Sequence, residues 1–377
     1  MKSISFITLM FWAMTSFAQN IPFLSAAPYD TVINAKKVSL YTISNGRMAA
    51  QITNYGGFIV SVFAPDKDGN YANLVTSYPT IAQYTRNNIG MVGPAVGRYA
   101  NRIANGTFTL DGKTYNLTRN NGAHTLHSGL NGFDHTVWDV VKTSDNEVVL
   151  MCVSPDGTDG FPGTLTTTLT YSITADNGLK VEYSATTDAP TVVSTTTHSY
   201  FNLNGAGNGD VMNHRLMVKA KYITETDRNG IPSGKMQKVK GTLYNFNKLT
   251  RIGDRQMDMK GFRFGQKFEI PKDKVMAFDN NFCVTHKKAG AVEKVATVYA
   301  PESGRVLEVW NNHPGLQVYT GSRRAIALES QMYPDSPNHP EFPSTTLRPG
   351  ETYNHVCIYK FKVQSSKFKD GTHVLTP

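Results

Sequence analysis

Hydrophobic residues occur along this chain in short runs rich in β-branched and aromatic side chains, separated by tight-turn dipeptides. Three pairs of runs meet at an Asp-Gly or Asn-Gly turn, in segments 64–75, 107–118 and 164–187. These dipeptides tolerate positive φ, and the resulting turns match the twist of paired antiparallel strands. Further strands are predicted over 304–312, 315–321 and 353–363.

Long helical patterns are nearly absent, and only 80–88, TIAQYTRNN, predicts a short helix or turn. Many strands at short spacing without helical blocks between them predict an all-β fold, a large antiparallel β-sandwich. No linker or fixed-period repeat divides the chain, so residues 19–377 are expected to form a single β-sandwich catalytic domain. Two loops rich in Gly and Asn, 202–214 and 226–235, are candidate positions for a functional site.

The first 18 residues have the features of a secretion signal. Lys2 precedes a short apolar run, and the small residues Ser16 and Ala18 fit the pockets of a signal peptidase. A membrane anchor is the alternative, but the run is shorter than the roughly 18 to 20 residues needed to span a bilayer. We therefore expect residues 1–18 to be removed, and the mature protein to be exported to a periplasm or the cell exterior without membrane insertion.

Composition narrows the class of partner. Lys and Arg total 38 against 29 Asp and Glu, a formal charge of +9, but the cations are scattered along the chain. This distribution argues against nucleic-acid binding, which concentrates cations on one face. Cys152, Cys283 and Cys357 each lie in a strand-like apolar run. We expect buried free thiols, with one disulfide as the alternative.

The segment 93–108, GPAVGRYANRIANGTF, places Arg98, Asn101 and Arg102 beside glycines. Such residues can approach a ligand, because the glycines let the backbone bend close to it. The alternative is an arginine that fixes the loop by bonding backbone carbonyls, and this segment alone favours that alternative.

His124 and His127 raise the question of a metal site. Residues three apart on a strand point to opposite faces, so these two imidazoles are not expected to converge on one ion. No cysteine pair or carboxylate lies at ligand spacing. We expect no metal, and one histidine that faces a ligand.

Three further residues suit proton transfer or polar recognition. His198, in THSYFNL, titrates near neutrality, although a core histidine bonded to a backbone carbonyl is the alternative. Asp279, in FDNNF, needs polar partners among its aromatic neighbours. Glu329 ends an apolar run, which favours a raised pKa and a role as a base; the alternative is a salt bridge to Arg323 or Arg324.

Aromatic residues close to these polar groups are typical of a sugar site. The C–H faces of a pyranose pack on aromatic rings while its hydroxyls take directed hydrogen bonds. The candidates are Tyr55, Tyr200, Phe282, Trp310 and Tyr319.

A set of motifs, in order, resembles the aldose 1-epimerase (galactose mutarotase) family. They are NYGG, GRYANRIANGTF, TLHSG, GFDHTVWDV, SPDGTDGFPG, HSYFNL, FDNNF, GLQVYTG and LESQMYPDSPNHPEFP, and they extend roughly from Ser39 to Val363. The chain departs from the family pattern at Thr197, where Asn is common, and at Ser128, where Gly is common.

The resemblance implies a β-sandwich of the galactose-mutarotase type with an open sugar cleft and no cofactor. It also implies that Glu329 is the general base and His198 the general acid that open and close the ring of a free hexose such as glucose or galactose. The positions that line the sugar site are then Asn101, Arg102, His127, Tyr200, Asp279 and Gln317. On this assignment the rate falls in acid as Glu329 gains a proton and in alkali as His198 loses one.

The partner implied is a small-molecule sugar, and we expect a monomer. A non-catalytic carbohydrate-binding protein on the same fold is the main rival, although it would need no acid–base pair. A glycoside hydrolase would need two carboxylates across the scissile bond, and a sugar-phosphate enzyme would need clustered cations.

Overall fold

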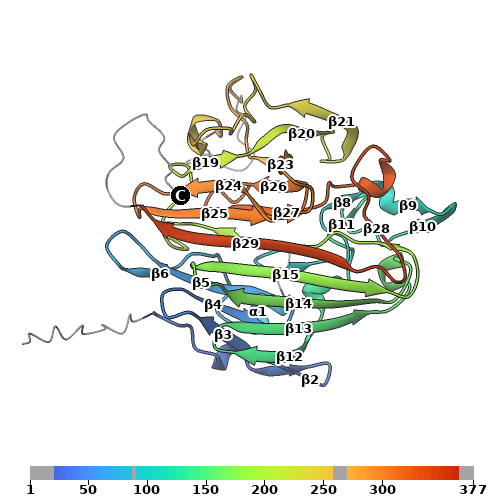
Figure 1. Cartoon of the computed structure of the whole chain (residues 1–377), viewed down its shortest axis with the longest axis horizontal. Coiled ribbons are helices and arrows are strands. Elements are labelled where there is room, and N and C mark those ends of the chain that lie inside the picture. Colours follow the sequence, from blue (N-terminus) through green and yellow to red (C-terminus); the bar gives the residue numbers. More distant parts are fainter. Residues whose placement is uncertain (1–20, 87–90, 258–269, 365–377) are drawn as a thin grey trace, which may run out of the picture.

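The computed structural model describes residues 21–86, 91–257 and 270–364, and most of its regular structure is antiparallel β-strand (Figure 1). The predicted all-β class is therefore confirmed. Residues 1–18, for which a secretion signal is predicted, lie outside the described residues.

The largest sheet has nine strands in the spatial order β12-β13-β14-β15-β29-β25-β24-β19-β22. Their bounds are β12 (Asp139–Ser144), β13 (Glu147–Ser154), β14 (Leu165–Ile173), β15 (Gly178–Thr187), β19 (Arg215–Val218), β22 (Thr250–Arg251), β24 (Glu293–Tyr299), β25 (Arg305–Asn311) and β29 (Tyr353–Val363). Along β14 every second residue is buried, including Leu165, Leu169 and Tyr171, and the residues between are half-buried. This alternation directs one face of the sheet to the core.

Two smaller sheets form the second layer. The four-stranded sheet consists of β3 (Leu40–Ser44), β4 (Ala49–Thr53), β5 (Ile59–Pro65) and β6 (Tyr71–Asn73). The six-stranded sheet, in spatial order, consists of β18 (Tyr200–Phe201), β27 (Ile326–Gln331), β26 (Gly315–Tyr319), β23 (Asp279–Val284), β20 (Ala220–Thr226) and β21 (Pro232–Lys238). A bridge between Val75 and Phe201 joins the two sheets edge to edge.

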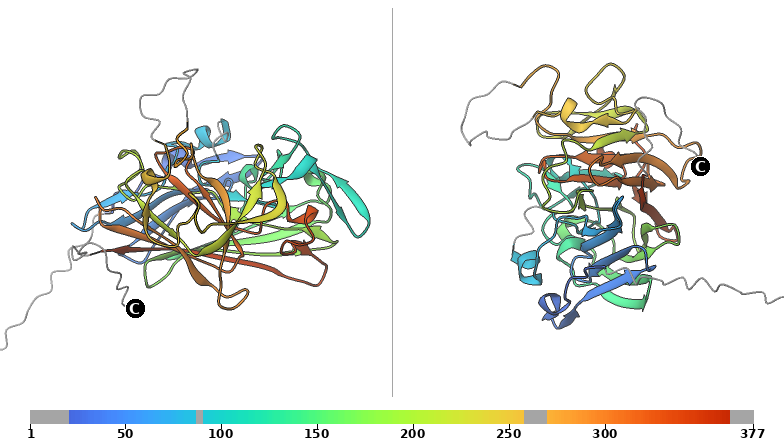
Figure 2. Two further views of the ribbon diagram at one scale, coloured as in Figure 1. Left: turned by 90° about the horizontal axis from the view of Figure 1, so that it is seen from above. Right: turned by 90° about the vertical axis from the view of Figure 1, so that its left-hand side faces the viewer.

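The hydrophobic core lies between these two layers (Figure 2). It combines side chains of the nine-stranded sheet, such as Leu150 and Val181, with Ile52 of the four-stranded sheet and Leu328 of the six-stranded sheet. The predicted sandwich is thus observed, with one large sheet packed against two smaller ones.

The remaining elements are short. Two-stranded ribbons pair β1 (Thr31–Ile33) with β2 (Lys36–Val38), β7 (Ala95–Val96) with β17 (Thr196–Thr197), β8 (Arg102–Ile103) with β11 (Thr125–Leu126), β9 (Thr107–Leu110) with β10 (Lys113–Asn116), and β16 (Thr191–Val192) with β28 (Thr346–Leu347). The helix α1 spans Ile81–Arg86, and 3-10 turns span Ala27–Tyr29, Ala104–Gly106, Phe133–His135, Thr158–Gly160, Ile252–Asp254 and Ser336–Asn338.

Local predictions agree with these elements. The strands β9 and β10 meet at Asp111 and Gly112, which adopt φ of 50° and 78° as the hairpin turn requires. The short helix or turn predicted over 80–88 corresponds to α1, and residues 87 and 88 lie outside the described residues. All three cysteines are buried and free, as predicted.

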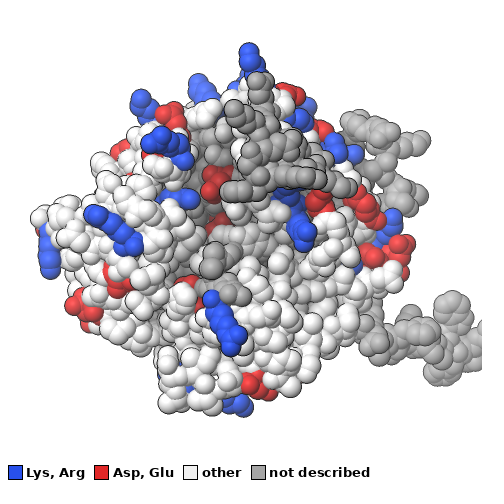
Figure 3. Space-filling view, turned by 180° about the vertical axis from the view of Figure 1, so that it is seen from behind, with Lys and Arg blue, Asp and Glu red and all other residues white. Residues whose placement is uncertain are grey.

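Basic and acidic side chains are interspersed on the face drawn in Figure 3, in line with the scattered charges of the sequence. In the part of the chain that the structure describes, no helix has the length and hydropathy needed to cross a membrane.

Candidate active site

Two alternate residue pairs along the six-stranded sheet form the floor of the candidate site. One pair joins Gln317 on β26 to Glu329 on β27. Two residues along, Asp279 pairs with Tyr319, and Tyr200 lies further along that second row, on β18. Side chains of one row share a face of the sheet, so residues far apart in the sequence meet here.

The alternation of the strands separates this floor from the core. Leu328 is fully buried in the hydrophobic core, whereas its neighbour Glu329 points to the opposite face, where the pocket lies. His198 precedes Tyr200 by two residues and therefore reaches the same pocket. Its Nε2 lies 3.5 Å from Oε1 of Glu329.

The opposite wall comes from the β8–β11 ribbon, where Arg102 pairs with Leu126. Asn101 and His127 flank this pair, and both adopt left-handed backbone conformations, with φ of 65° and 50°. The backbone N–H of His127 donates to the carbonyl of Asn101 (3.0 Å). This local turn directs both side chains into the pocket rather than along the ribbon.

The resulting pocket has a volume of about 210 Å³. Its walls include seven of the eight residues predicted for the site: Asn101, Arg102, His127, His198, Tyr200, Asp279 and Glu329. The exception is Gln317, which is buried beneath the surface and donates through Nε2 to Oδ1 of Asp279 (2.6 Å). Gln317 therefore orients Asp279, instead of lining the pocket as predicted.

The aromatic candidates divide between the site and the rest of the fold. Tyr200 and Tyr319 line the pocket, and their ring centroids are 6.0 Å apart. In contrast, Tyr55 stacks on Phe58 in a separate cluster, and Phe282 belongs to the core. Trp310 is also elsewhere: it lies beneath Lys360 on the nine-stranded sheet.

The fold also decides between the alternative roles of Arg98 and of Glu329. Arg98 is buried and donates to the backbone carbonyls of Ser154, Pro155 and Pro162, so it fixes a loop and does not face the pocket. Glu329 has no salt bridge to Arg323 or Arg324 among the described residues. The basic side chain within ion-pair distance of its carboxylate is His198.

Burial dominates the electrostatics of the pair. It raises the pKa of Glu329 well above the ordinary carboxyl value, the nearby Asp279 carboxylate raises it further, and Arg102 opposes both effects. Burial also lowers the pKa of His198 to about 4. These opposite shifts favour a pair that holds a single proton, with Glu329 protonated and His198 neutral. Transfer of this proton across 3.5 Å gives a carboxylate facing an imidazolium.

His127 is held as a neutral hydrogen-bond donor. The backbone N–H of Asn101 donates to its Nδ1 (3.2 Å), so this nitrogen is unprotonated and the neutral ring carries its proton on Nε2. Burial lowers the pKa of His127 well below its usual value, and the nearby charges of His198 and Arg102 lower it further. The ring therefore offers an N–H to a ligand oxygen.

His127, His198 and Glu329 present ligand atoms within 4.8 Å of one another, a convergence that the spacing of the sequence did not predict. A histidine that binds a metal through Nε2 ordinarily donates its other N–H to an acceptor. Here Nδ1 of His127 accepts a hydrogen bond instead. This donor set therefore does not fit a resident metal. His124 lies outside the set, and its Nδ1 accepts a hydrogen bond from the N–H of Asn105.

Similarity to known proteins agrees with this geometry. The sequence model of the family described as aldose 1-epimerase matches residues 39–360. The chain belongs to the aldose 1-epimerase family. It is 34% identical over 351 residues to the galactose mutarotase of Sus scrofa, covering 89% of this chain and 97% of that protein. It is also 34% identical to the aldose 1-epimerase of Escherichia coli K12, over 84% of this chain and 93% of that protein.

Solved structures of this family have the same fold. The GalM/aldose epimerase homologue from C. elegans superposes with a TM-score of 0.78 at 27% identity, covering 87% of this chain and all of that one. The galactose 1-epimerase from Lactobacillus acidophilus gives 0.73 at 24% identity, over 89% of this chain and 97% of that one.

At Ser128 and Thr197, where this chain departs from the family pattern, the side-chain hydroxyl makes contacts of its own. The hydroxyl of Ser128 accepts from the N–H of Tyr99 (2.6 Å) and lies 3.1 Å from the carbonyl oxygen of Tyr99. It thereby ties the β11 end to the loop that carries Asn101. Thr197 lies in β17, pairs with Ala95, and holds its hydroxyl 3.4 Å from that of Ser199.

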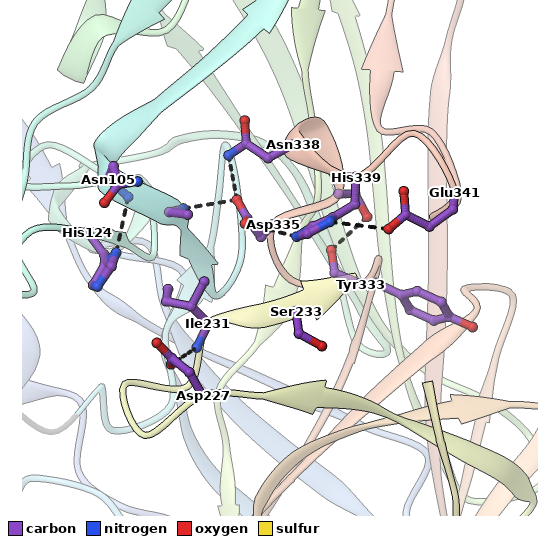
Figure 4. Close-up of polar contacts among 12 residues, drawn as sticks. Asn105, His124, Asp227, Ile231, Ser233, Tyr333, Asp335, Asn338, His339 and Glu341 are labelled. Atoms are coloured by element: carbon purple, nitrogen blue, oxygen red, sulfur yellow. Dashed lines mark hydrogen bonds and ion pairs between the residues drawn. The ribbon is translucent and has the colours of Figure 1, made fainter. Parts of the chain in front are cut away.

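A loop over 333–341 holds the ribbon that carries Arg102, a connection that the sequence did not reveal. The N–H of Asp335 donates to the carbonyl of Arg102, and its buried Oδ1 accepts from the N–H of Ala104 (both 2.9 Å). Its other oxygen lies 3.3 Å from Nε2 of His339, whose Nδ1 faces Glu341 at 3.4 Å (Figure 4). Asp335 is thus a positioning residue for Arg102.

Other residues of the site were also missed. Met91 and Leu126 add apolar wall to the pocket, and nothing in their sequence context marked them. Of the two Gly/Asn-rich loops, 226–235 reaches the site through Gly230, which packs on the Arg102 guanidinium. The other, 202–214, contributes no residue to the pocket among those described.

Asp335→Ala tests the positioning role. The change leaves the Ala104 N–H without its acceptor and frees the ribbon, so we expect KM for a hexose to rise roughly tenfold while kcat changes less. Glu341→Gln is the matched control, because its half-exposed side chain faces His339 and has no hydrogen bond to the Arg102 ribbon among the described residues, and its KM should stay at the wild-type value. An unchanged KM in Asp335→Ala would refute the role.

The pH dependence of kcat/KM follows from the two pKa shifts. If His198 and Glu329 act as the acid–base pair that the family resemblance implies, their one-proton form is the reactive one. Activity should then fall in acid as His198 gains its proton near pH 4, and in alkali as Glu329 loses its own. This order is the reverse of the one predicted from the sequence. NMR of the imidazole in the free protein should report a neutral His198 at pH 6, and an imidazolium at that pH would contradict the assignment.

Proposed function

We propose that this protein interconverts the α and β anomers of free hexoses such as glucose and galactose, by acid–base ring opening and closure without a cofactor. The observation that carries the proposal is the pair of buried, oppositely shifted groups, His198 and Glu329, which face each other across 3.5 Å on the wall of a polar pocket. The names of the family relatives support the same reaction.

The reaction needs two proton transfers. The Glu329 carboxylate takes the proton of the anomeric hydroxyl while the His198 imidazolium protonates the ring oxygen, and the bond from C1 to the ring oxygen breaks. The open-chain aldehyde turns by half a turn about the C1–C2 bond. The two residues then reverse their roles, which closes the other anomer and returns the proton to His198. Each general acid–base group contributes about 10²–10⁴-fold.

The other pocket residues bind the sugar in this proposal. Asp279, oriented by Gln317 and lying 3.8 Å from Arg102, accepts from ring hydroxyls. His127 donates its Nε2–H near the ring oxygen, because its ring lies beside that of His198 (centroids 5.5 Å apart). Tyr200 and Tyr319 offer ring surface to the C–H face of the sugar.

Glu329→Gln and His198→Asn test the acid–base pair. Gln is nearly isosteric with Glu but cannot take the proton, so we expect mutarotation of fresh α-D-glucose, followed by polarimetry, to fall by about 10²-fold or more. His198→Asn should lose a similar factor, and the double variant should be little worse than either single one, because the two groups act together.

Glu308→Gln is the matched control, since Glu308 is a buried carboxylate that pairs with Lys294 and Lys362 on the nine-stranded sheet and does not line the pocket. The Glu308→Gln variant should keep the wild-type rate of mutarotation. Near-native rates in Glu329→Gln, with hexose binding retained, would favour a non-catalytic carbohydrate-binding protein.

We also propose that the protein acts outside the cytoplasm as a monomer after loss of residues 1–18. The support for export is the charged, apolar and small-residue pattern of the N-terminus. Mass spectrometry of the exported protein should give an N-terminus at Gln19 or close to it. Recovery of intact Met1 from that fraction would contradict export by cleavage.

A further inference from the structure

The strand that carries Glu329 is anchored by polar contacts that cross the hydrophobic core from β29. Over most of β29 every second residue is buried and faces the core. Two of these residues reach β27 on either side of Glu329. The hydroxyl of Tyr359 donates to the carbonyl of Leu328 (2.8 Å), and Nε2 of His355 lies 2.8 Å from the hydroxyl of Ser330. The nine-stranded sheet therefore holds the segment that presents the carboxylate.

The same imidazole also holds the segment that carries the other member of the pair. Nδ1 of His355 lies 3.0 Å from the hydroxyl of Thr195, three residues before His198. Tyr183, which is opposite His355 in the pairing of β15 with β29, donates its hydroxyl to the carbonyl of Thr196 (2.7 Å). One nitrogen of His355 thus contacts the segment of His198, and the other contacts β27.

The environment of His355 suits a fixed bridge. Its ring is 1% exposed and lies nearly parallel to those of His313 and Tyr183, with centroids 3.9 Å and 5.8 Å away. Burial lowers the pKa of His355 well below its usual value, and His313 lowers it further, so the ring is neutral. A neutral imidazole donates from one nitrogen and accepts at the other, and the hydroxyls of Thr195 and Ser330 can take either part. Both bonds can therefore form at once.

Further contacts fix the two partners of His355. The backbone N–H of Thr195 donates to the hydroxyl of Tyr353 (3.0 Å), and Nδ2 of Asn311 donates to the hydroxyl of Ser330 (2.9 Å). Tyr353 lies on β29 and Asn311 on the neighbouring strand β25. Both ends of the bridge are thus held against one sheet, and because these bonds are buried, a shift of either end would be costly.

We propose that His355 is a positioning residue that fixes the separation of His198 and Glu329. Ser330 and Glu329 are neighbours on β27 and point to opposite faces, so the bond on the core side sets the place of the carboxylate on the pocket side. Thr195 has the same role for the segment of His198. The inference rests on the proposed acid–base function, in which two groups 3.5 Å apart must act on one sugar.

His355→Phe tests the bridge, because the change removes both bonds and keeps a planar ring. We expect kcat for α-D-glucose, followed by polarimetry, to fall roughly 10- to 100-fold, since a misplacement of about 1 Å can cost 10²-fold. KM should change less than about twofold, because Asp279 and Arg102 are held by other contacts. An unchanged kcat, or a loss that appears in KM alone, would overturn the proposal.

His214→Phe is the matched control for a general loss of stability. His214 is fully buried, and its Nε2 accepts from the N–H of Leu203 (3.1 Å), but it has no hydrogen bond to β27 or to the segment of His198 among the described residues. Calorimetry should show a lower melting temperature for both variants, while His214→Phe keeps the wild-type kcat. An equal loss of kcat in both would contradict a specific role for His355.

Thr195→Val and Thr195→Ser test one end of the bridge with smaller changes. Val keeps the shape of Thr without its hydroxyl, so kcat should fall about tenfold. Ser keeps the hydroxyl, so kcat should stay within about twofold of the wild type. Equal rates in the two variants would refute the bridge even if His355→Phe does not fold.

Crystal structures separate this proposal from the proposed function. If the wild-type protein mutarotates no sugar, the acid–base function is wrong, and the distance from Nε2 of His198 to Oε1 of Glu329 still decides the role of His355. A change in this distance of about 0.5 Å or more in Thr195→Val, but not in Thr195→Ser, supports the proposal. The same distance in both variants and in the wild type overturns it.

Discussion

The site depends on the pairing register of β26 and β27. In this register Gln317 is opposite Glu329, and Val318 is opposite Leu328. A slip of one residue would turn Glu329 into the hydrophobic core and place Leu328 in the pocket, because side chains alternate strictly between the two faces. The burial of Leu328 between the two layers thus stabilises the register, and the register aims the carboxylate.

Burial of the acid–base pair has an energetic cost that a substrate can offset. Within the described part of the chain, Oε2 of Glu329 is buried and has no hydrogen-bond partner. A polar atom in this state is unfavourable until a ligand bonds to it. The same desolvation moves the two pKa values past each other, so that one proton can belong to either residue. In the proposed reaction this lets the two groups exchange roles within one turnover.

Rigid support surrounds the reacting groups, and open space adjoins them on one side. Asp335 ties the ribbon of Arg102 to the loop over 333–341, and Ser128 ties its neighbour to Tyr99. Beyond His127 the structure opens into a further pocket, with a volume of about 550 Å³.

The sequence by itself determined the features that depend on near neighbours: the hairpin at Asp111, the short helix, and the strand class of the runs between turns. Its motifs also identified seven residues that line the pocket, because their types and order resemble a known family. Only the tertiary structure decided what depends on distant pairs. It placed Gln317 behind Asp279, brought His127 to Glu329, set the protonated nitrogen of His127 through the Asn101 N–H, and reversed the pKa order of the pair. Those properties arise from burial and from contacts between strands, which local sequence does not encode.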